Sequence, residues 1–413
     1  MGIFSFLGTK KKQQQPTHAI ALDIGTEVAK GLFFELTPAG TVIKASYYIK
    51  QPLEAMQAGR IINEKLVEST VSMVLDGLMR QVKDRPKNLP VILGIAGEMI
   101  NGVAINANIE RLRKPDMPID PSEEKQLLSE LFEQVATEGK AQLAEKTGIP
   151  EDKIMVLNIT LTGGYIDGKP FKVLEGLQGR YLSASLYASF APVQVTQGIF
   201  NIASRLGLDI KGIIVQPYAV ASALAQDNIG FSGIIIDIGG GTTDIAVVNK
   251  GIDIQTQMIA FGGRAFTQRI AKEFSLSYNI AEEQKIKYSA GILESGLASR
   301  IREALQQDVR LWLDTVRTAL AKIHVEDTYP EVIYLCGGGA MLPDLQDGIL
   351  SYPWSKFLEF KHHPKLQIAS VSKLDKIFDN TGQLNHPYDV TPAAIAHYMY
   401  ELAKRPLYNY VGF

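Results

Sequence analysis

A glycine-rich turn in the second half of the chain is the segment best suited to chemistry. Residues 237–244 read DIGGGTTD and join two apolar runs rich in isoleucine and valine. Glycine is unfavourable within strands, so three in succession indicate that the backbone approaches something closely, usually an anion held by its amides. An ordinary hairpin bend is the alternative. We predict that Asp237 helps to hold a metal ion. The predicted phosphate-binding residues of this turn are Gly239, Gly240, Gly241, Thr242 and Thr243.

A second turn, near the start of the chain, has a similar design. Its residues 23–26 read DIGT, and Asp23 ends the apolar run HAIALD. A carboxylate there needs a partner, and Mg²⁺, which keeps much of its water shell, is a suitable one. Gly25 would let the backbone approach a phosphate, Thr26 would donate to it, and Lys30 would add positive charge. The alternative is an ordinary turn capped by an aspartate.

A third turn follows the apolar run VIYLC. Gly337, Gly338 and Gly339 have no carboxylate before them. A surface without side chains for a base or a ribose therefore suits this turn better than a metal site. The three turns match neither a P-loop nor a dinucleotide fingerprint, each of which lies in one short stretch. We instead expect a cleft between two related domains, in which Asp23 and Asp237 converge on one Mg²⁺–phosphate group.

The remaining pattern places these turns in an α/β protein with an inserted subdomain. A chain of 413 residues is too long for one ordinary core. Apolar residues at helical spacing predict a helix over about 64–82, and the segment after it reads strand, strand, helix, strands. The predicted units are a tail at 1–16, a first domain at 17–90 that continues at 196–230 and 388–413, an inserted subdomain at 91–195, and a second domain at 231–387 with a helical part at about 263–330.

The composition excludes several classes of protein. The net charge of −2 provides no basic surface for nucleic acid. The single cysteine, Cys336, permits no internal disulfide and suits the cytosol. No run of about 18 apolar residues predicts a membrane-spanning helix. The chain starts MGIFSFLGTKKK, in which the apolar residues precede the lysines, the reverse of a secretory signal.

Together, the turns resemble those of the actin, sugar-kinase and heat-shock-chaperone ATPase superfamily, and within it the FtsA-like bacterial cell-division family. ALDIGTEVAKG resembles the first phosphate motif, IIDIGGGTTDIAVV the second, and YLCGGGAMLPDL the adenosine motif. VILGIAGEMINGVAI resembles the start of that family's extra subdomain, and FGGRAFTQRIA the stretch after the second hairpin. The resemblance covers about residues 17–400. It implies an actin-like two-domain ATPase fold with an inserted strand-helix-strand-strand subdomain.

The resemblance also implies the ligand and further site residues. ATP or ADP with Mg²⁺ would bind in the cleft, and the third turn would line the adenosine pocket. Glu282 and Lys285 would contact the ribose or the base. Gln216 stands where the superfamily places the residue that orients the attacking water. An amide positions water but is a weak base at neutral pH, so we expect at most slow ATP hydrolysis.

The function implied by the resemblance is a scaffold that lies peripherally on the inner face of the bacterial plasma membrane. Its expected partners are the tubulin-like division protein FtsZ, other division proteins, and further copies of itself in a filament. FtsA proteins usually end in an amphipathic membrane helix, whereas this chain ends YELAKRPLYNYVGF. We therefore expect the N-terminal tail, with its apolar residues and three lysines, to bind an anionic membrane instead. A disordered start of the chain is the alternative.

Two other functions stay open. A relative of the pilus-assembly protein PilM would share the fold and the extra subdomain, lack the C-terminal helix, and bind a peptide of a membrane protein. A sugar or acetate kinase of the same superfamily is the third hypothesis, although no substrate-binding acid is evident in the sequence.

Overall fold

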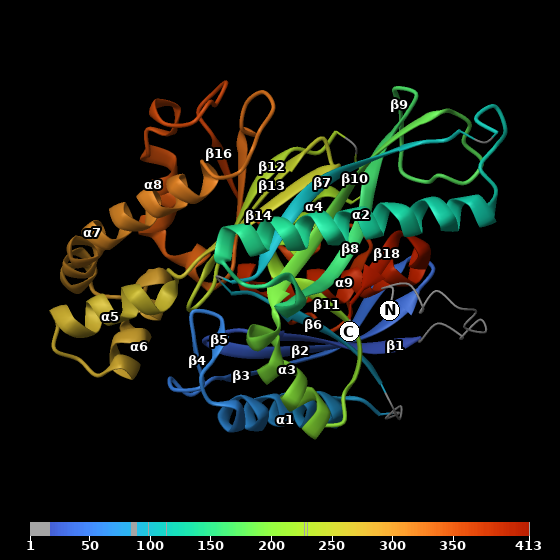
Figure 1. The fold of residues 1–413 in the computed structure, drawn as a ribbon. Coiled ribbons are helices and arrows are strands. Elements are labelled where there is room, and N and C mark those ends of the chain that lie inside the picture. The colour runs from blue at the N-terminus through green and yellow to red at the C-terminus, as the bar shows by residue number, and fades with distance from the viewer. Residues whose placement is uncertain are drawn as a thin grey trace.

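The described part of the protein contains three large sheets, one two-stranded sheet and the helices between and around them (Figure 1). The computed structural model describes residues 17–83, 89–97, 99–112, 114–226, 228 and 230–412. The predicted membrane-binding tail, residues 1–16, lies outside the described residues. No helix within the described ranges is both long enough and apolar enough to cross a membrane.

The first sheet has the strand order β11-β6-β1-β2-β3-β17. Strands β1, β2 and β3 form an antiparallel meander, whereas β6 runs parallel to β1, β11 parallel to β6, and β17 parallel to β3. A small hairpin, β4–β5, follows β3. The strands are β1 (His18–Ile24), β2 (Val28–Thr37), β3 (Gly40–Lys50), β4 (Met56–Gln57), β5 (Arg60–Ile61), β6 (Pro90–Ile95), β11 (Asp209–Val215) and β17 (Ile377–Asp379).

Alternate residues of these strands enter two different cores, because successive side chains of a strand point to opposite faces. One face packs against α1 (Glu64–Gln81) and α3 (Val193–Arg205). Helix α1 begins where the Asn63 side chain accepts a hydrogen bond from Leu66 N, and its buried residues recur at helical spacing. The other face packs against α4 (Gln216–Ala225) and α9 (Val390–Lys404).

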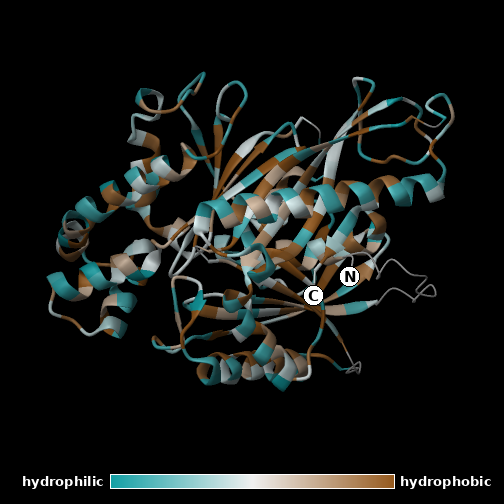
Figure 2. Ribbon diagram, viewed as in Figure 1, coloured by the Kyte–Doolittle hydropathy of each residue, from teal (hydrophilic) through white to brown (hydrophobic). Residues whose placement is uncertain are grey.

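The second sheet has the strand order β14-β13-β12-β15-β16. One of its faces packs against α4, which in turn packs against α9, so these two helices form a layer between the two sheets. Its other face carries the helices α5 to α8, whose exposed sides are mostly hydrophilic (Figure 2). The elements are β12 (Gly233–Ile238), β13 (Thr243–Asn249), β14 (Asp253–Ile259), β15 (Val332–Cys336), β16 (Lys365–Ile368), α5 (Gly263–Glu273), α6 (Tyr278–Ser289), α7 (Ser295–Leu320) and α8 (Pro343–Ser351).

The third sheet forms the inserted subdomain and has the order β18-β8-β10-β7, with β9 paired to β8. The long helix α2 lies across it (Figure 1). Asp120 caps the start of α2, and Gly148, with φ of 72°, ends it. The elements are β7 (Asn101–Glu110), α2 (Pro121–Thr147), β8 (Ile154–Ile166), β9 (Lys169–Phe171), β10 (Tyr181–Pro192) and β18 (Asn409–Val411).

Three strands lie in sheets other than those expected from the sequence. The insert was expected from residue 91, but β6 pairs with β1 and β11 in the first sheet, so the third sheet starts at Asn101. Strand β17 was expected in the second domain but pairs with β3. Strand β18 was expected in the first domain but pairs with β8 of the insert. In each case the partner strand is distant in sequence, and an apolar run does not specify its partner.

Candidate functional site

A cleft of about 450 Å³ opens between the first and second sheets. Its walls come from the β1–β2 turn, the β12–β13 turn, the glycine turn after β15, and helices α5 and α6. The structure thus brings together segments that are far apart in the sequence. The predicted site residues that line the cleft are Asp23, Gly25, Thr26, Lys30, Gln216, Asp237, Gly239, Gly240, Gly241, Thr242, Glu282, Lys285, Gly337, Gly338 and Gly339.

Asp23, near the end of β1, is a buried carboxylate at the floor of the cleft, with 6% of its surface exposed. Gln216, the first residue of α4, donates through Nε2 to Asp23 Oδ1 at 2.7 Å. Burial raises the pKa of Asp23 to about 6; the charge of Lys30 lowers it and that of Asp237 raises it further. The ionised form of this carboxylate is therefore costly unless a cation joins it.

The second turn adds two more buried carboxylates. Asp237, in β12, accepts a hydrogen bond from the hydroxyl of Thr391, and burial raises its pKa against the lowering effects of that bond and of Lys30. Burial also raises the pKa of Asp244 well above its usual range, and Asp237 adds to this effect. Among the described residues, Asp244 Oδ1 has no hydrogen-bond partner. An unpaired buried acceptor beside two carboxylates is a position where a hydrated cation would be stabilising.

Glycine allows the turns to approach one another. A Cβ atom on Gly240 would lie 2.4 Å from Glu27 Cβ, and one on Gly241 would lie 2.7 Å from Thr26 Oγ1. Gly337 has φ of +81°, where L side chains are rare. The distances at Gly240 and Gly241 are too short for real Cβ contacts, so the packing of the two turns requires glycine at both positions.

Backbone amides of both hairpin turns are available to an anion. Gly239 N donates to Thr242 O at 2.9 Å and closes the second turn. In the part of the chain that the structure describes, the amides of Thr26, Gly240 and Gly241 donate to no protein group. Unpaired amides at a glycine turn form a concave site for an anion such as phosphate.

Lys30 and Thr243 have contacts that the sequence did not predict. Lys30 lines the cleft, and its Nζ donates to the carbonyl of Tyr388 at 2.5 Å, so its charge is held near the carboxylates. Thr243 is fully buried and does not line the cleft. Its hydroxyl donates to Phe261 O at 2.6 Å and accepts from Trp312 Nε1 at 2.9 Å. The predicted phosphate contact of Thr243 does not fit this placement.

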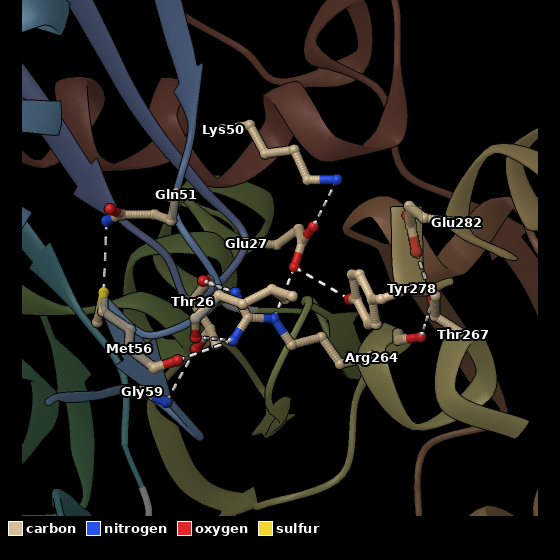
Figure 3. Close-up of polar contacts among 12 residues, drawn as sticks. Thr26, Glu27, Lys50, Gln51, Met56, Gly59, Arg264, Thr267, Tyr278 and Glu282 are labelled. Atoms are coloured by element: carbon tan, nitrogen blue, oxygen red, sulfur yellow. Dashed lines mark hydrogen bonds and ion pairs between the residues drawn. The ribbon is translucent and has the colours of Figure 1, made fainter. Parts of the chain in front are cut away.

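Glu282 and Lys285 lie one helical turn apart on α6 and face the cleft from the second domain. Lys285 Nζ lies 2.8 Å from Glu282 Oε2 and donates to Gly263 O at 3.0 Å and to Thr267 Oγ1 at 2.7 Å. Thr267 in turn donates to Glu282 (Figure 3). The pair is therefore pre-positioned, and its contact with a ribose or base stays a prediction.

A group of charged and polar residues at the cleft was not predicted from the sequence. Glu27, Arg264 and Tyr278 line the cleft, and Glu27 accepts hydrogen bonds from both of the others (Figure 3). Asp244 lines it as well. The available signal in the sequence was a charged residue directly after a glycine-containing segment, Glu27 in DIGTE and Arg264 in FGGR. It gave no indication that the two charges would meet across the cleft.

The chemistry of the cleft fits a nucleotide with Mg²⁺. The pKa values of Asp23, Asp237 and Asp244 are raised, and a bound cation would lower them again. The unpaired amides lie at the two hairpin turns. Within the described ranges, no three acidic, histidine or cysteine side chains converge closely enough to ligate a metal directly. A Mg²⁺ ion that keeps much of its water shell does not need such a cluster.

Comparison with known proteins identifies relatives among pilus-assembly and cell-division proteins. The sequence model of the type IV pilus assembly protein PilM matches residues 202–352. The chain is 27% identical over 397 residues to the cell division protein FtsA of Pseudomonas aeruginosa, covering 94% of this chain and 86% of that protein. It is 25% identical to FtsA of Neisseria meningitidis, covering 70% of this chain and 66% of that protein. These matches confirm the FtsA-like resemblance, with PilM as the second relative.

Solved structures confirm the actin-like fold. The PilM–PilN type IV pilus biogenesis complex contains a chain with a TM-score of 0.66 and 17% identity, covering 94% of this chain and 99% of that chain. The ethanolamine utilization protein EutJ of Carboxydothermus hydrogenoformans has a TM-score of 0.51 and 15% identity, covering 92% of this chain and 89% of that chain. At these identities the likeness concerns the fold alone.

Proposed function

We propose that this chain is an FtsA-like, ATP-binding actin-like scaffold that assembles at the inner membrane face and tethers the FtsZ-type cell-division ring. The observation that carries the division role is the match to FtsA over 94% of this chain and 86% of the relative, which includes the inserted subdomain. Division proteins, further copies of the chain and an anionic membrane surface are the proposed partners. The proposed membrane contact is the tail at residues 1–16, outside the described residues.

We propose that the cleft holds ATP or ADP with Mg²⁺. The free amides of the two hairpin turns would hold the phosphates, and Asp23, Asp237 and Asp244 would hold Mg²⁺ through water. The turn after β15 and the Glu282–Lys285 pair would face the nucleoside. Bound ATP would supply a transferable phosphoryl group.

The chain's own residues favour slow hydrolysis in this proposal. Gln216 donates to Asp23, so its side chain is oriented toward the buried carboxylate. It would position a water molecule, but an amide does not remove the proton at neutral pH. Since the carboxylates must be ionised to hold a cation, Mg²⁺-nucleotide binding should release protons and strengthen as pH rises through about 6.

A PilM-like adaptor is the second candidate function. It is favoured by the family match over residues 202–352 and by the TM-score of 0.66 to the chain from the PilM–PilN complex. Such an adaptor would bind a peptide of a membrane protein and would not need to polymerise.

Assembly separates the two candidates. Purified full-length protein is incubated with ATP and Mg²⁺ on anionic lipid, then sedimented and imaged, with and without FtsZ. The variant Asp237→Asn, which keeps the size of the side chain, is the nucleotide-site control. Filaments that need ATP, need Asp237 and co-sediment FtsZ support the scaffold. A protein that stays unassembled and ignores FtsZ in all conditions contradicts it and favours the adaptor.

The tail is tested separately by liposome co-sedimentation of the full chain and of a variant lacking residues 1–12. Equal binding of the two proteins would remove the tail from the proposal.

A further inference from the structure

Arg264 connects the two domains across the mouth of the cleft. It stands in the first turn of α5, on the second domain, yet its guanidinium reaches the first domain (Figure 3). Nε donates to Glu27 Oε2 at 2.6 Å, Nη2 to Thr26 O at 2.7 Å, and Nη1 to Met56 O at 2.8 Å. Only 13% of the Arg264 side chain is exposed, so these bonds are largely shielded from water. Its own amide donates to Gly240 O at 2.8 Å.

This residue therefore joins both phosphate-binding turns. Thr26 and Glu27 belong to the turn between β1 and β2, and Gly240 belongs to the turn between β12 and β13. Met56 lies in the β4–β5 hairpin, which is also tied to the first turn because Gly59 N donates to Thr26 Oγ1 at 2.9 Å. The three side-chain nitrogens of one guanidinium thus hold several groups of the first domain at once, a fixed arrangement that a flexible ammonium does not reproduce.

Glu27 explains why a cation is needed at this point. Its carboxylate lies beside the amides that would face phosphate, where an unpaired negative charge would repel an anion. Arg264 and Lys50, whose Nζ lies 3.3 Å from Glu27 Oε1, neutralise it, and the Tyr278 hydroxyl donates to Glu27 Oε2 at 3.4 Å. The ion pair is partly buried, with 16% of the Glu27 side chain exposed, so it is screened less than a surface pair.

We propose that Arg264 is an interdomain latch that locks the two phosphate-binding turns together and so sets the rate of nucleotide release. The latch rests on the proposed nucleotide function, because the latch restrains the opening of the cleft in which the nucleotide would bind. Separation of the domains breaks all four side-chain bonds of Arg264, including a longer one from Nη1 to Leu53 O at 3.4 Å, and exposes the Glu27 carboxylate to the phosphates. Nucleotide leaves only after that separation, so weakening the latch accelerates release.

Helix α5 offers a matched control. Arg269, five residues further along, pairs through Nε and Nη2 with Asp308 at 2.6 and 2.7 Å, entirely within the second domain. Arg269 does not line the cleft. Arg269→Gln removes the same charge from the same helix without touching the contact between the domains.

The first test measures the release of a fluorescent ADP analogue after an ATP chase in stopped flow. Arg264→Gln should release it about tenfold to a hundredfold faster, as expected for loss of one or two charge-assisted bonds. Arg264→Lys keeps the charge but loses the planar guanidinium with its several donors, so its release rate should lie between those of Arg264→Gln and the wild type. Glu27→Gln should also speed release, whereas Arg269→Gln should release at the wild-type rate. Wild-type release from Arg264→Gln, or equal acceleration by Arg269→Gln, would overturn the latch.

The second test does not require nucleotide. Amide hydrogen exchange of the nucleotide-free protein reports the turns directly, because Arg264 N and Gly59 N are bonded at the latch. Arg264→Gln should increase exchange over residues 24–28 and 56–61, and Arg269→Gln should not. If the wild type binds no nucleotide, the proposed function fails. The hydrogen-exchange comparison then decides by itself whether Arg264 holds the two turns together. If Arg264→Gln does not fold, Arg264→Lys and Glu27→Gln carry both tests.

Discussion

Replacing Asp23 with asparagine should stabilise the nucleotide-free protein at neutral pH. The pKa of Asp23 is raised from 3.8 to about 6, chiefly by burial. A folded-state pKa above the unfolded value means that the folded protein binds more protons between these two pH values, so stability falls as pH rises through that window. A shift of roughly two units corresponds to about 3 kcal/mol, which is fully lost above about pH 6. Asparagine cannot ionise, and its Oδ1 can still accept from Gln216.

Equilibrium urea unfolding of wild type and Asp23→Asn between about pH 4 and pH 8 measures this effect. The variant should match the wild type near pH 4, gain on it up to about pH 6, and keep a constant advantage of up to about 3 kcal/mol above that. The difference between the two proteins reports Asp23 together with its charge coupling to Asp237 and Asp244, because these neighbouring carboxylates raise one another's pKa. With Mg²⁺ and ATP present, the wild type should be the more stable protein, because the variant has lost a carboxylate that would hold the cation. A variant that is less stable at pH 8 without nucleotide, or a difference that does not change with pH, would refute the reasoning.

Three further substitutions test other parts of the structure. Gly240→Ala should cost about 1–3 kcal/mol in urea unfolding because its Cβ would lie 2.4 Å from Glu27 Cβ; Gly338→Ala, which enters open space, is the control and should leave the stability unchanged. Gln216→Glu places a second carboxylate at the 2.7 Å contact with Asp23, so the single-turnover ATPase rate should change; an unchanged rate would remove Gln216 from the mechanism. Tyr408→Phe removes the hydroxyl that donates to the buried Glu124 and accepts from Leu174 N, so it should cost about 1–3 kcal/mol and speed hydrogen exchange in β18; wild-type exchange in β18 would contradict this role.

The site turns could be predicted from the sequence because each is a local pattern. A strand that ends in Asp-x-Gly places its carboxylate and its turn together, whatever the rest of the chain does. Fifteen of the predicted site residues line one cleft, although Gln216, Glu282 and Lys285 among them were implied by the family resemblance and not by a local pattern. Thr243 departs from the pattern because side chains alternate along β13, so that Asp244 takes the cleft side and Thr243 enters the core.

Contacts between distant segments could not be predicted in the same way. Strands β6, β17 and β18 are recognisable as extended apolar or aromatic segments, but their partners are chosen by long-range packing. Arg264 is similar, since its role depends on Glu27 and Met56, which lie in another domain. A sequence pattern specifies which residues form a turn, but it does not specify which side chain spans the gap between two turns.

The C-terminal strand has a mechanical consequence. The chain leaves α9, which packs on the first sheet, and its residues Asn409–Val411 then pair with β8 of the insert. Tyr408 anchors the same segment beneath α2 through Glu124. Tension applied to the chain beyond this strand would therefore be borne first by the inserted subdomain, and only afterwards by the helices that lie behind the cleft.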